Sequence, residues 1–84
     1  MARLEIEFSR QAARQYRKLP KEYRRFIDAA FSRLSQGLEL DLRPVKGQDD
    51  VYRIRVGKYR VLFAKLAKTA LVFRISPRGD MYKK

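Results

Sequence analysis

The sequence predicts one α+β domain spanning residues 1–84, in which an antiparallel sheet packs on a helical hairpin in the order β-α-α-β-β-β. Three observations predict this fold class. Apolar residues alternate with charged residues near the N-terminus, recur at helical spacing through residues 10–36, and alternate again in three runs after residue 50. A chain of 84 residues has room for one modest core.

The first strand and the first helix follow directly from these patterns. Residues Leu4–Phe8 alternate between apolar and acidic side chains, which indicates a half-buried strand. Ser9 can cap the helix that follows, because its hydroxyl can accept a backbone N–H of the first turn. We expect that helix over Arg10–Leu19, and Pro20 ends its pattern.

A second helix is expected to begin at Pro20 or Lys21, antiparallel to the first across a tight turn, and to end at Gly37. Residues 38–50 look irregular, because Pro44 and Gly47 interrupt them. The apolar stripe that should face the sheet consists of Tyr23, Phe26, Ile27, Ala30, Phe31 and Leu34.

Three further strands are expected over residues 51–56, 59–66 and 70–76. The first two flank Gly57-Lys58, a two-residue loop with glycine in its first position, as a type II′ hairpin requires. Across such a loop, cross-strand partners share one face of the sheet. The face expected to pack on the helices carries Tyr52, Ile54, Val56, Tyr59, Val61 and Phe63, extended in the last strand by Leu71, Phe73 and Ile75.

The opposite face of the sheet is expected to carry arginines. Arg55 and Arg60 should lie directly opposite each other, a like-charge pair that destabilises a sheet by up to ~1 kcal/mol. These arginines either solvate an exposed face or form a site for anions. We favour an anion site, because clustered planar guanidinium groups suit phosphate oxygens and local rules are broken most often at functional sites. The cluster consists of Arg53, Arg55, Arg60 and, one strand over, Arg74.

The composition narrows the chemistry. Twenty-one Lys and Arg against nine Asp and Glu give a net charge of +12, which favours a polyanionic partner, nucleic acid or acidic protein. The chain has no cysteine and no histidine, so disulfides, thiolate chemistry and histidine general bases are excluded. No apolar run reaches membrane-spanning length and no signal-peptide pattern begins the chain. We therefore expect a cytoplasmic protein that needs no metal.

Two stretches of the sequence resemble RelE-type toxins of the RelE/ParE superfamily. The run VYRIRVGKYRVLF, Val51–Phe63, is similar to the family's central hairpin pattern Y-(R/K)-I-(R/K)-x-x-x-Y-R-(V/I/L). The run ISPRGDMY, Ile75–Tyr82, is similar to the family's ending I-(G/S)-x-R-x-x-x-Y. The early strand, the helix pair and Leu42–Gly47 also fit. The resemblance covers essentially the whole chain and implies a RelE-like microbial RNase-type fold.

The resemblance also implies an activity. RelE-like toxins are ribosome-dependent endoribonucleases that cut messenger RNA in the ribosomal A site by attack of a ribose 2′-OH, and so inhibit translation. It implies that Arg60 and Arg78 neutralise the charge of the transition state and that Tyr82 orients or activates the 2′-OH. Arg53 and Arg55 would hold the RNA phosphate. Arg74 joins this phosphate site from the strand register alone.

The implied partners are a cognate antitoxin protein, acidic or amphipathic, together with ribosomal RNA and messenger RNA. Neither a small-molecule cofactor nor a membrane is expected to take part.

Two other functions stay open at this point. A ParE-like member would inhibit DNA gyrase without cutting RNA, although the Arg and Tyr of the ending favour RelE. A non-catalytic RNA- or ribosome-binding protein is the other alternative. It gains support because many relatives have lysine in the basic pair, whereas Arg53 and Arg55 cannot act as bases. Some relatives also have histidine at the position of Pro77.

Overall fold

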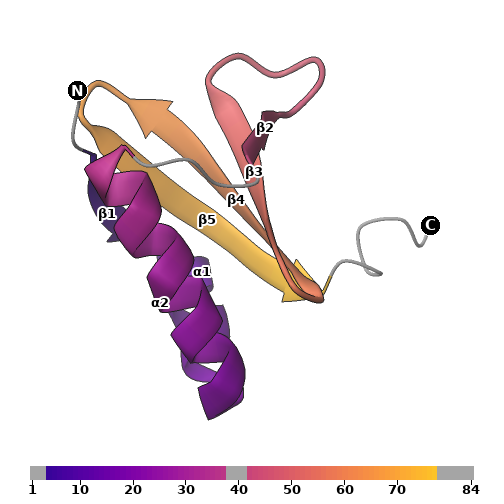
Figure 1. Cartoon of the computed structure of the whole chain (residues 1–84). Coiled ribbons are helices and arrows are strands. Elements are labelled where there is room, and N and C mark those ends of the chain that lie inside the picture. Colours follow the sequence, from indigo (N-terminus) through magenta and orange to yellow (C-terminus); the bar gives the residue numbers. More distant parts are fainter. Residues whose placement is uncertain (1–3, 38–41, 78–84) are drawn as a thin grey trace.

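The structure is a computed structural model that describes residues 4–37 and 42–77. Two helices cover one face of a five-stranded sheet, which confirms the α+β class (Figure 1). The elements are β1 (Glu5–Phe8), α1 (Arg10–Arg17), α2 (Lys21–Gln36), β2 (Leu42–Pro44), β3 (Val51–Val56), β4 (Tyr59–Leu66) and β5 (Thr69–Pro77).

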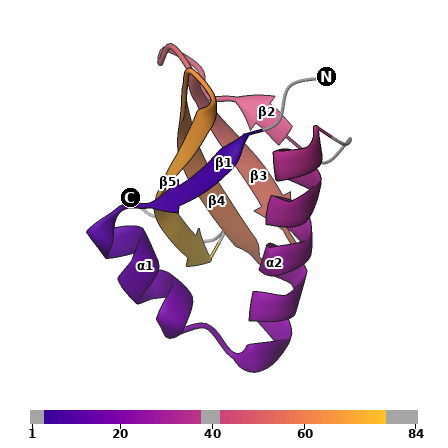
Figure 2. The same cartoon turned by 90° about the vertical axis from the view of Figure 1, so that its left-hand side faces the viewer.

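The helix ends follow the local signals in the sequence. The N–H of Ala12 donates to the Ser9 hydroxyl at 3.1 Å, so Ser9 caps α1 as expected. Gly37 ends α2 in the left-handed conformation, with φ of 75°, and its N–H donates to carbonyls of the last turn. Figure 2 shows the two helices running in roughly opposite directions but splayed apart from their connecting turn.

Phe8 fills the space between the splayed helices. Its ring lies 5.5 Å from the ring of Tyr16 on α1 and 5.4 Å from that of Phe31 on α2, in edge-to-face geometry. Tyr16 also donates a 2.6 Å hydrogen bond to the carboxylate of Asp28, which ties α1 to α2 directly. Two ring contacts of Phe8 therefore join the first strand to both helices.

The sheet has the strand order β1-β5-β4-β3-β2. The pairs among β2, β3, β4 and β5 are antiparallel, as expected, but β1 runs parallel to β5. The expectation of a wholly antiparallel sheet is therefore wrong at this edge. No tight turn joins β1 to β5, so the local rules that set the direction of a hairpin do not apply to this pair.

The strand β2 was not expected, because its residues fall in the stretch assigned as irregular. It pairs with β3 and forms an edge of the sheet. A strand of three residues is too short to show alternation, and Pro44 argues against a strand in the centre of a sheet. At an edge, however, the missing N–H of proline needs no partner.

The β3–β4 hairpin has the expected register. Val56 lies opposite Tyr59, Arg55 opposite Arg60, and Ile54 opposite Val61. Gly57 has a φ of +57° and Lys58 has no positive φ, consistent with a type II′ turn.

The face of β5 differs from the expectation. A β-bulge interrupts the β4–β5 register, so that Phe63 pairs with Val72 while Leu62 pairs with Arg74. Because β5 has one extra residue at the bulge, the residues of β5 before the bulge that face the core are shifted by one position from the expected alternation. Val72 and Ala70 are therefore fully buried in place of the expected Phe73 and Leu71, which are half-buried.

The core lies between the sheet and the helices. Its fully buried large side chains are Phe63, Ile27, Ile54, Val61 and Val72. Of the two helices in the described part of the chain, neither has the length and apolar character that crossing a membrane requires.

Candidate nucleic-acid interface

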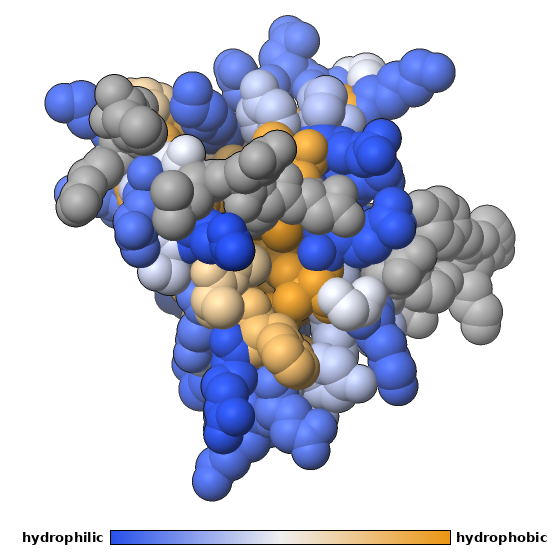
Figure 3. Space-filling view, in the orientation of Figure 1, coloured by the Kyte–Doolittle hydropathy of each residue, from blue (hydrophilic) through white to orange (hydrophobic). Residues whose placement is uncertain are grey.

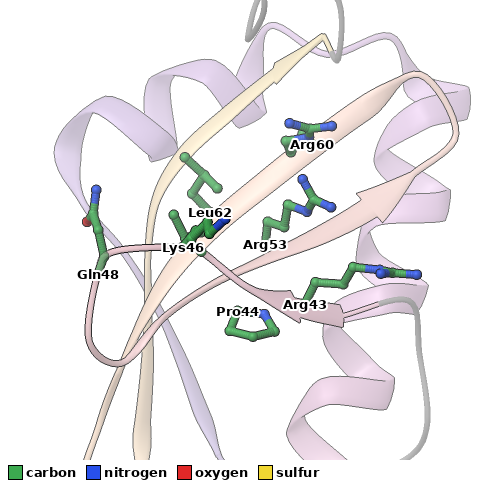
Figure 4. Close-up of a pocket in the computed structure, with 8 residues that line it drawn as sticks. Arg43, Pro44, Lys46, Gln48, Arg53, Arg60 and Leu62 are labelled. Carbon is green, nitrogen blue, oxygen red and sulfur yellow. The ribbon is translucent and has the colours of Figure 1, made fainter.

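A pocket of about 640 Å³ opens on the face of the sheet that the helices do not cover (Figure 4). Figure 4 shows side chains from β2, β3 and β4 and from the loop between β2 and β3 around this space, with the helices behind the sheet. The lining residues are Arg43, Pro44, Val45, Lys46, Gln48, Arg53, Arg60 and Leu62. Four of these eight residues are cationic and none is acidic.

Strand register brings the arginines of the pocket together. Arg43 on β2 lies directly opposite Arg53 on β3, so both side chains leave the same face of the sheet. Arg53 in turn lies opposite Leu62 on β4. Arg60 is two residues before Leu62 on β4 and therefore shares this face. Three neighbouring strands thus contribute one guanidinium group each.

The loop between β2 and β3 adds the fourth cation. The N–H of Val45 donates to the carbonyl of Val51 at 2.8 Å, and that of Gln48 to the carbonyl of Val45 at 3.2 Å, so the loop turns back beside β3. Gly47 has a φ of +81°, a conformation that favours glycine. This turn sets Lys46 on the rim of the pocket.

The cations of the pocket differ in burial. Arg60 is only 5% exposed, Arg53 is half-buried, and Arg43 and Lys46 are exposed. Arginine keeps its proton even when buried. An anion that reaches Arg60 would leave much of its water behind, and there its attraction to a guanidinium group is stronger than in bulk solvent. The geometry suits a phosphate entering from the exposed rim toward the buried end.

Only part of the cluster predicted from the sequence shares this pocket. Arg53 and Arg60 line it together. Arg55 is exposed and lines a different groove, of about 390 Å³, between α2 and β3. Arg74 is exposed on β5, opposite Leu62, and does not line the pocket. Arg78 and Tyr82, which the RelE resemblance marked, lie outside the described residues.

Sequence reasoning missed three residues of this region. Arg43 and Lys46 were not singled out, because their segment carried no strand signal. The available clue was that Arg43 directly precedes Pro44 and that Lys46 follows it by two residues. Ser76 is the third: it pairs with Arg60 across β4 and β5 and is 7% exposed. Ser76 and Arg60 are the buried polar or charged residues of the described chain.

The described residues contain no group of three or more histidine, cysteine, aspartate or glutamate side chains that could hold a metal ion. Among the described residues that line the pocket, the polar side chains are the cations Arg43, Lys46, Arg53 and Arg60 and the amide of Gln48.

Comparison with known proteins points to one family. The model of the family described as the ParE toxin of the type II toxin–antitoxin system parDE matches residues 6–82. The protein named RelE1 of Methanocaldococcus jannaschii is 27% identical over an alignment of 84 positions that covers 93% of this chain and 93% of that protein.

Solved structures show the same fold. The crystal structure of the RelB–RelE antitoxin–toxin complex from Methanococcus jannaschii matches with a TM-score of 0.79 and 24% identity, over 92% of this chain and 95% of that one. The isolated RelE toxin of E. coli matches with a TM-score of 0.78 and 18% identity, over 88% of this chain and 83% of that one. The chain therefore belongs to the RelE/ParE toxin superfamily and is a toxin of a type II toxin–antitoxin system.

Proposed function

We propose that this toxin is a metal-independent endoribonuclease that cuts messenger RNA in the A site of the ribosome and so stops translation. The observation that carries this proposal is the pocket on the open sheet face, where Arg43, Lys46, Arg53 and Arg60 converge and none of the described lining residues is acidic. Such a site is suited to an RNA phosphate, because several planar donors can share its oxygens.

The proposed reaction needs three tasks to be performed. The ribose 2′-oxygen attacks the adjacent phosphorus, and the bond from phosphorus to the 5′-oxygen of the next nucleotide breaks. The 2′-OH gives up its proton, and the leaving 5′-oxygen receives one. While the phosphorus is bonded to both the attacking 2′-oxygen and the leaving 5′-oxygen, the pentacoordinate phosphate carries extra negative charge. Positioned cations that neutralise this charge lower the barrier, and one such donor is commonly worth 10²–10³ in rate.

We assign charge neutralisation first to Arg60, because its burial makes it the most desolvated cation of the pocket. Arg53 would hold the same phosphate from β3, and Arg43 and Lys46 would hold the neighbouring linkage near the rim. Arginine cannot act as the base, so proton transfer falls to Tyr82 or to groups of the ribosome or substrate. Arg78 is assigned to the transition state with Arg60, as the RelE resemblance implies. Arg55 and Arg74 would guide RNA outside the pocket.

We further propose that a cognate antitoxin binds this chain. The related RelE of Methanococcus jannaschii was solved in complex with its antitoxin RelB. A net charge of +12 suits an acidic partner, which would meet a favourable field on approach. An antitoxin that covers the pocket would block the RNA directly.

A second candidate is inhibition of DNA gyrase, which the description of the matching family as ParE favours. A gyrase inhibitor acts on protein and leaves RNA intact. A third candidate, a ribosome-binding protein without nuclease activity, is favoured by arginine at both positions of the basic pair.

One pair of assays separates these candidates. The protein is expressed briefly in growing cells, and the 5′ ends of messenger RNA are mapped against the reading frame. The purified protein is then tested for inhibition of supercoiling by gyrase. The proposal predicts new ends within codons and unaffected supercoiling. Inhibited supercoiling with intact messenger supports the gyrase candidate and contradicts the proposal. Arrested translation with intact messenger supports the third candidate.

A further inference from the structure

Gln15 is a polar residue on the side of α1 that faces the core. Helical spacing places it on the same side as Ala12, three residues before it, and Leu19, four residues after it, and both of these side chains are buried. In contrast, hydrophilic side chains cover the outer surface at the lower end of the molecule, where α2 begins (Figure 3). Gln15 itself is half-buried. A polar side chain in such a place destabilises the fold unless it has a hydrogen-bond partner.

The partner of Gln15 lies on β5. The side-chain oxygen of Gln15 accepts a hydrogen bond from the backbone N–H of Ile75 at 2.7 Å. The two residues are 60 positions apart in the sequence, and they meet because α1 packs on β5. This hydrogen bond therefore fixes the end of β5 to the helix behind it.

Gln15 takes the place of a neighbouring strand at this edge of β5. The strand β1 pairs with β5 only as far as Phe8, which lies opposite Val72. The chain then leaves the sheet at Ser9 and begins α1. Beyond Val72, none of the described strands pairs with this edge of β5. A side chain therefore holds the N–H of Ile75 where a strand would otherwise do so.

The same hydrogen bond sets how β5 meets Arg60. In an antiparallel pair, successive residues direct their backbone N–H and C=O groups alternately toward the partner strand and away from it. Ile75 directs its N–H at Gln15, away from β4. The backbone groups of Ser76 are therefore directed at β4, where Arg60 is the opposite residue. Gln15 and Arg60 thus hold the same two-residue segment of β5 from its two edges.

Ser76 also lies beside the Arg60 side chain on the pocket face of the sheet. The two residues are cross-strand partners, so their side chains leave the same face. Ser76 is 7% exposed and Arg60 is 5% exposed. A close-packed guanidinium group has little room to turn, so its direction follows the position of the strands around it. A shift of the end of β5 would therefore redirect the cation to which we assign charge neutralisation.

We propose that Gln15 is a positioning residue for Arg60: from the helix side of the sheet it fixes the segment of β5 beside which the Arg60 guanidinium group is directed at the RNA phosphate. The inference rests on the proposed function for the reaction that Arg60 serves. Gln15 does not line the pocket. Its effect falls on the chemical step rather than on binding, because a donor stabilises the charge of the transition state only when it is held in place beforehand.

The test compares Gln15 with Gln11, an exposed glutamine four residues earlier on α1. Gln15→Ala removes the acceptor, and Gln15→Glu keeps a side-chain oxygen at the same chain length. Gln11→Ala and Gln11→Glu make the same changes of helix propensity and charge outside the contact. Thermal unfolding defines a temperature at which every variant is folded. If Gln15→Ala does not fold, Gln15→Asn replaces it, because its amide is one methylene shorter.

Messenger cleavage on purified ribosomes is measured in a single turnover over a range of protein concentrations. Gln15→Ala should slow the cut at saturating protein by about 10–10²-fold. The protein concentration that gives half the maximal rate should change by less than about twofold, since a purely transition-state effect leaves binding unchanged. Gln15→Glu should recover most of the rate, and both Gln11 variants should cut as the wild type does. A folded Gln15→Ala that cuts at the wild-type rate at saturation, or an equal loss in Gln11→Ala, would overturn the proposal.

A spectroscopic measurement separates this inference from the nuclease proposal. The arginine Nε–H signals are recorded by NMR, and the signal of Arg60 is identified by its absence in Arg60→Lys. Gln15→Ala should shift this signal toward those of exposed arginines, while Gln15→Glu and Gln11→Ala should leave it near its wild-type position. If the wild type does not cut messenger, the nuclease proposal fails, and the Arg60 signal still decides whether Gln15 orients Arg60. An unchanged Arg60 signal in folded Gln15→Ala overturns the positioning role, whatever the cleavage rate.

Discussion

Arg43 on β2 lies directly opposite Arg53 on β3, and both side chains line the pocket on the open face of the sheet. Arg55 and Arg60 form a second like-charge pair across β3 and β4. Like charges in this relation destabilise a sheet by roughly 0.2–1 kcal/mol. A fold that holds cations together in this way has them in place before an anion arrives, which is the arrangement that electrostatic catalysis requires.

Inorganic phosphate should therefore stabilise the folded protein. At a concentration ten times its dissociation constant, a ligand of the folded state adds about 1.4 kcal/mol. For a domain of this size that corresponds to a rise in Tm of roughly 6–10 °C. The measurement is thermal unfolding in phosphate and in chloride at equal ionic strength.

The Arg53→Gln variant should lose most of this phosphate effect, because it removes one guanidinium group from the pocket. Lys65→Gln, an exposed substitution outside the pocket, is the control and should keep it. Equal stabilisation of both variants would place the bound phosphate elsewhere.

Gln15 on α1 should contribute to the stability of the end of β5. The backbone N–H of Ile75 donates to the Gln15 side-chain oxygen at 2.7 Å in a partly buried setting. This contact holds the strand one residue before Ser76, the partner of Arg60. Gln15→Ala leaves that N–H without its acceptor and should cost about 1–3 kcal/mol in urea unfolding. Gln15→Glu keeps an acceptor and should recover most of the loss. If both variants unfold at the same urea concentration, the hydrogen bond is not what stabilises this end.

The bond between Tyr16 and Asp28 predicts a dependence on alkaline pH. The hydrogen bond that Tyr16 donates to the Asp28 carboxylate is the largest cause that raises the pKa of Tyr16 above its ordinary value. Partial burial and the negative charge of Asp28 raise this pKa further. The folded protein thus holds the phenol proton more tightly than the unfolded chain. The stability that this hydrogen bond contributes is fully present below about pH 10, the pKa of tyrosine in the unfolded chain. It is lost as the pH rises through the higher pKa of Tyr16 in the folded protein.

The measurement is the difference in unfolding free energy between the wild type and Tyr16→Phe, followed from neutral pH upward. Phenylalanine keeps the ring contact with Phe8 but cannot donate to Asp28. The difference should favour the wild type at neutral pH and shrink above about pH 10. A difference that stays constant through this range would contradict the assignment.

Two of the four cations of the pocket, Arg53 and Arg60, could be predicted because a hairpin register follows from its turn. Once Gly57-Lys58 is recognised as a two-residue loop, every pair in β3 and β4 follows, including Arg55 with Arg60. The helix ends at Ser9 and Gly37 could be predicted equally well from the sequence, since each depends on contacts within a few residues.

The remaining features depend on contacts that local patterns do not encode. The bulge near Phe73 changes which residues of β5 face the core, yet the sequence of β5 contains no glycine that would signal it. The pairing of Arg43 with Arg53 needs β2, whose three residues become a strand only beside β3. The burial of Arg60 but not of Arg55 likewise depends on strands outside the hairpin: Arg60 pairs with Ser76 on β5 as well as with Arg55, whereas the described pairs between β2 and β3 end at Ile54, one residue before Arg55.

The most direct test of the nuclease proposal is cleavage of a defined messenger on purified ribosomes with an empty A site, followed in a single turnover with the protein in excess. The wild type should cut within the A-site codon. Arg60→Gln and Arg53→Gln should each slow the cut by about 10²–10³, while Lys65→Gln should cut at the wild-type rate. Arg53 is half-buried, so its variant remains informative if the substitution at buried Arg60 impairs folding. An intact messenger with the wild type, or cleavage by folded Arg53→Gln at the wild-type rate, would contradict the account.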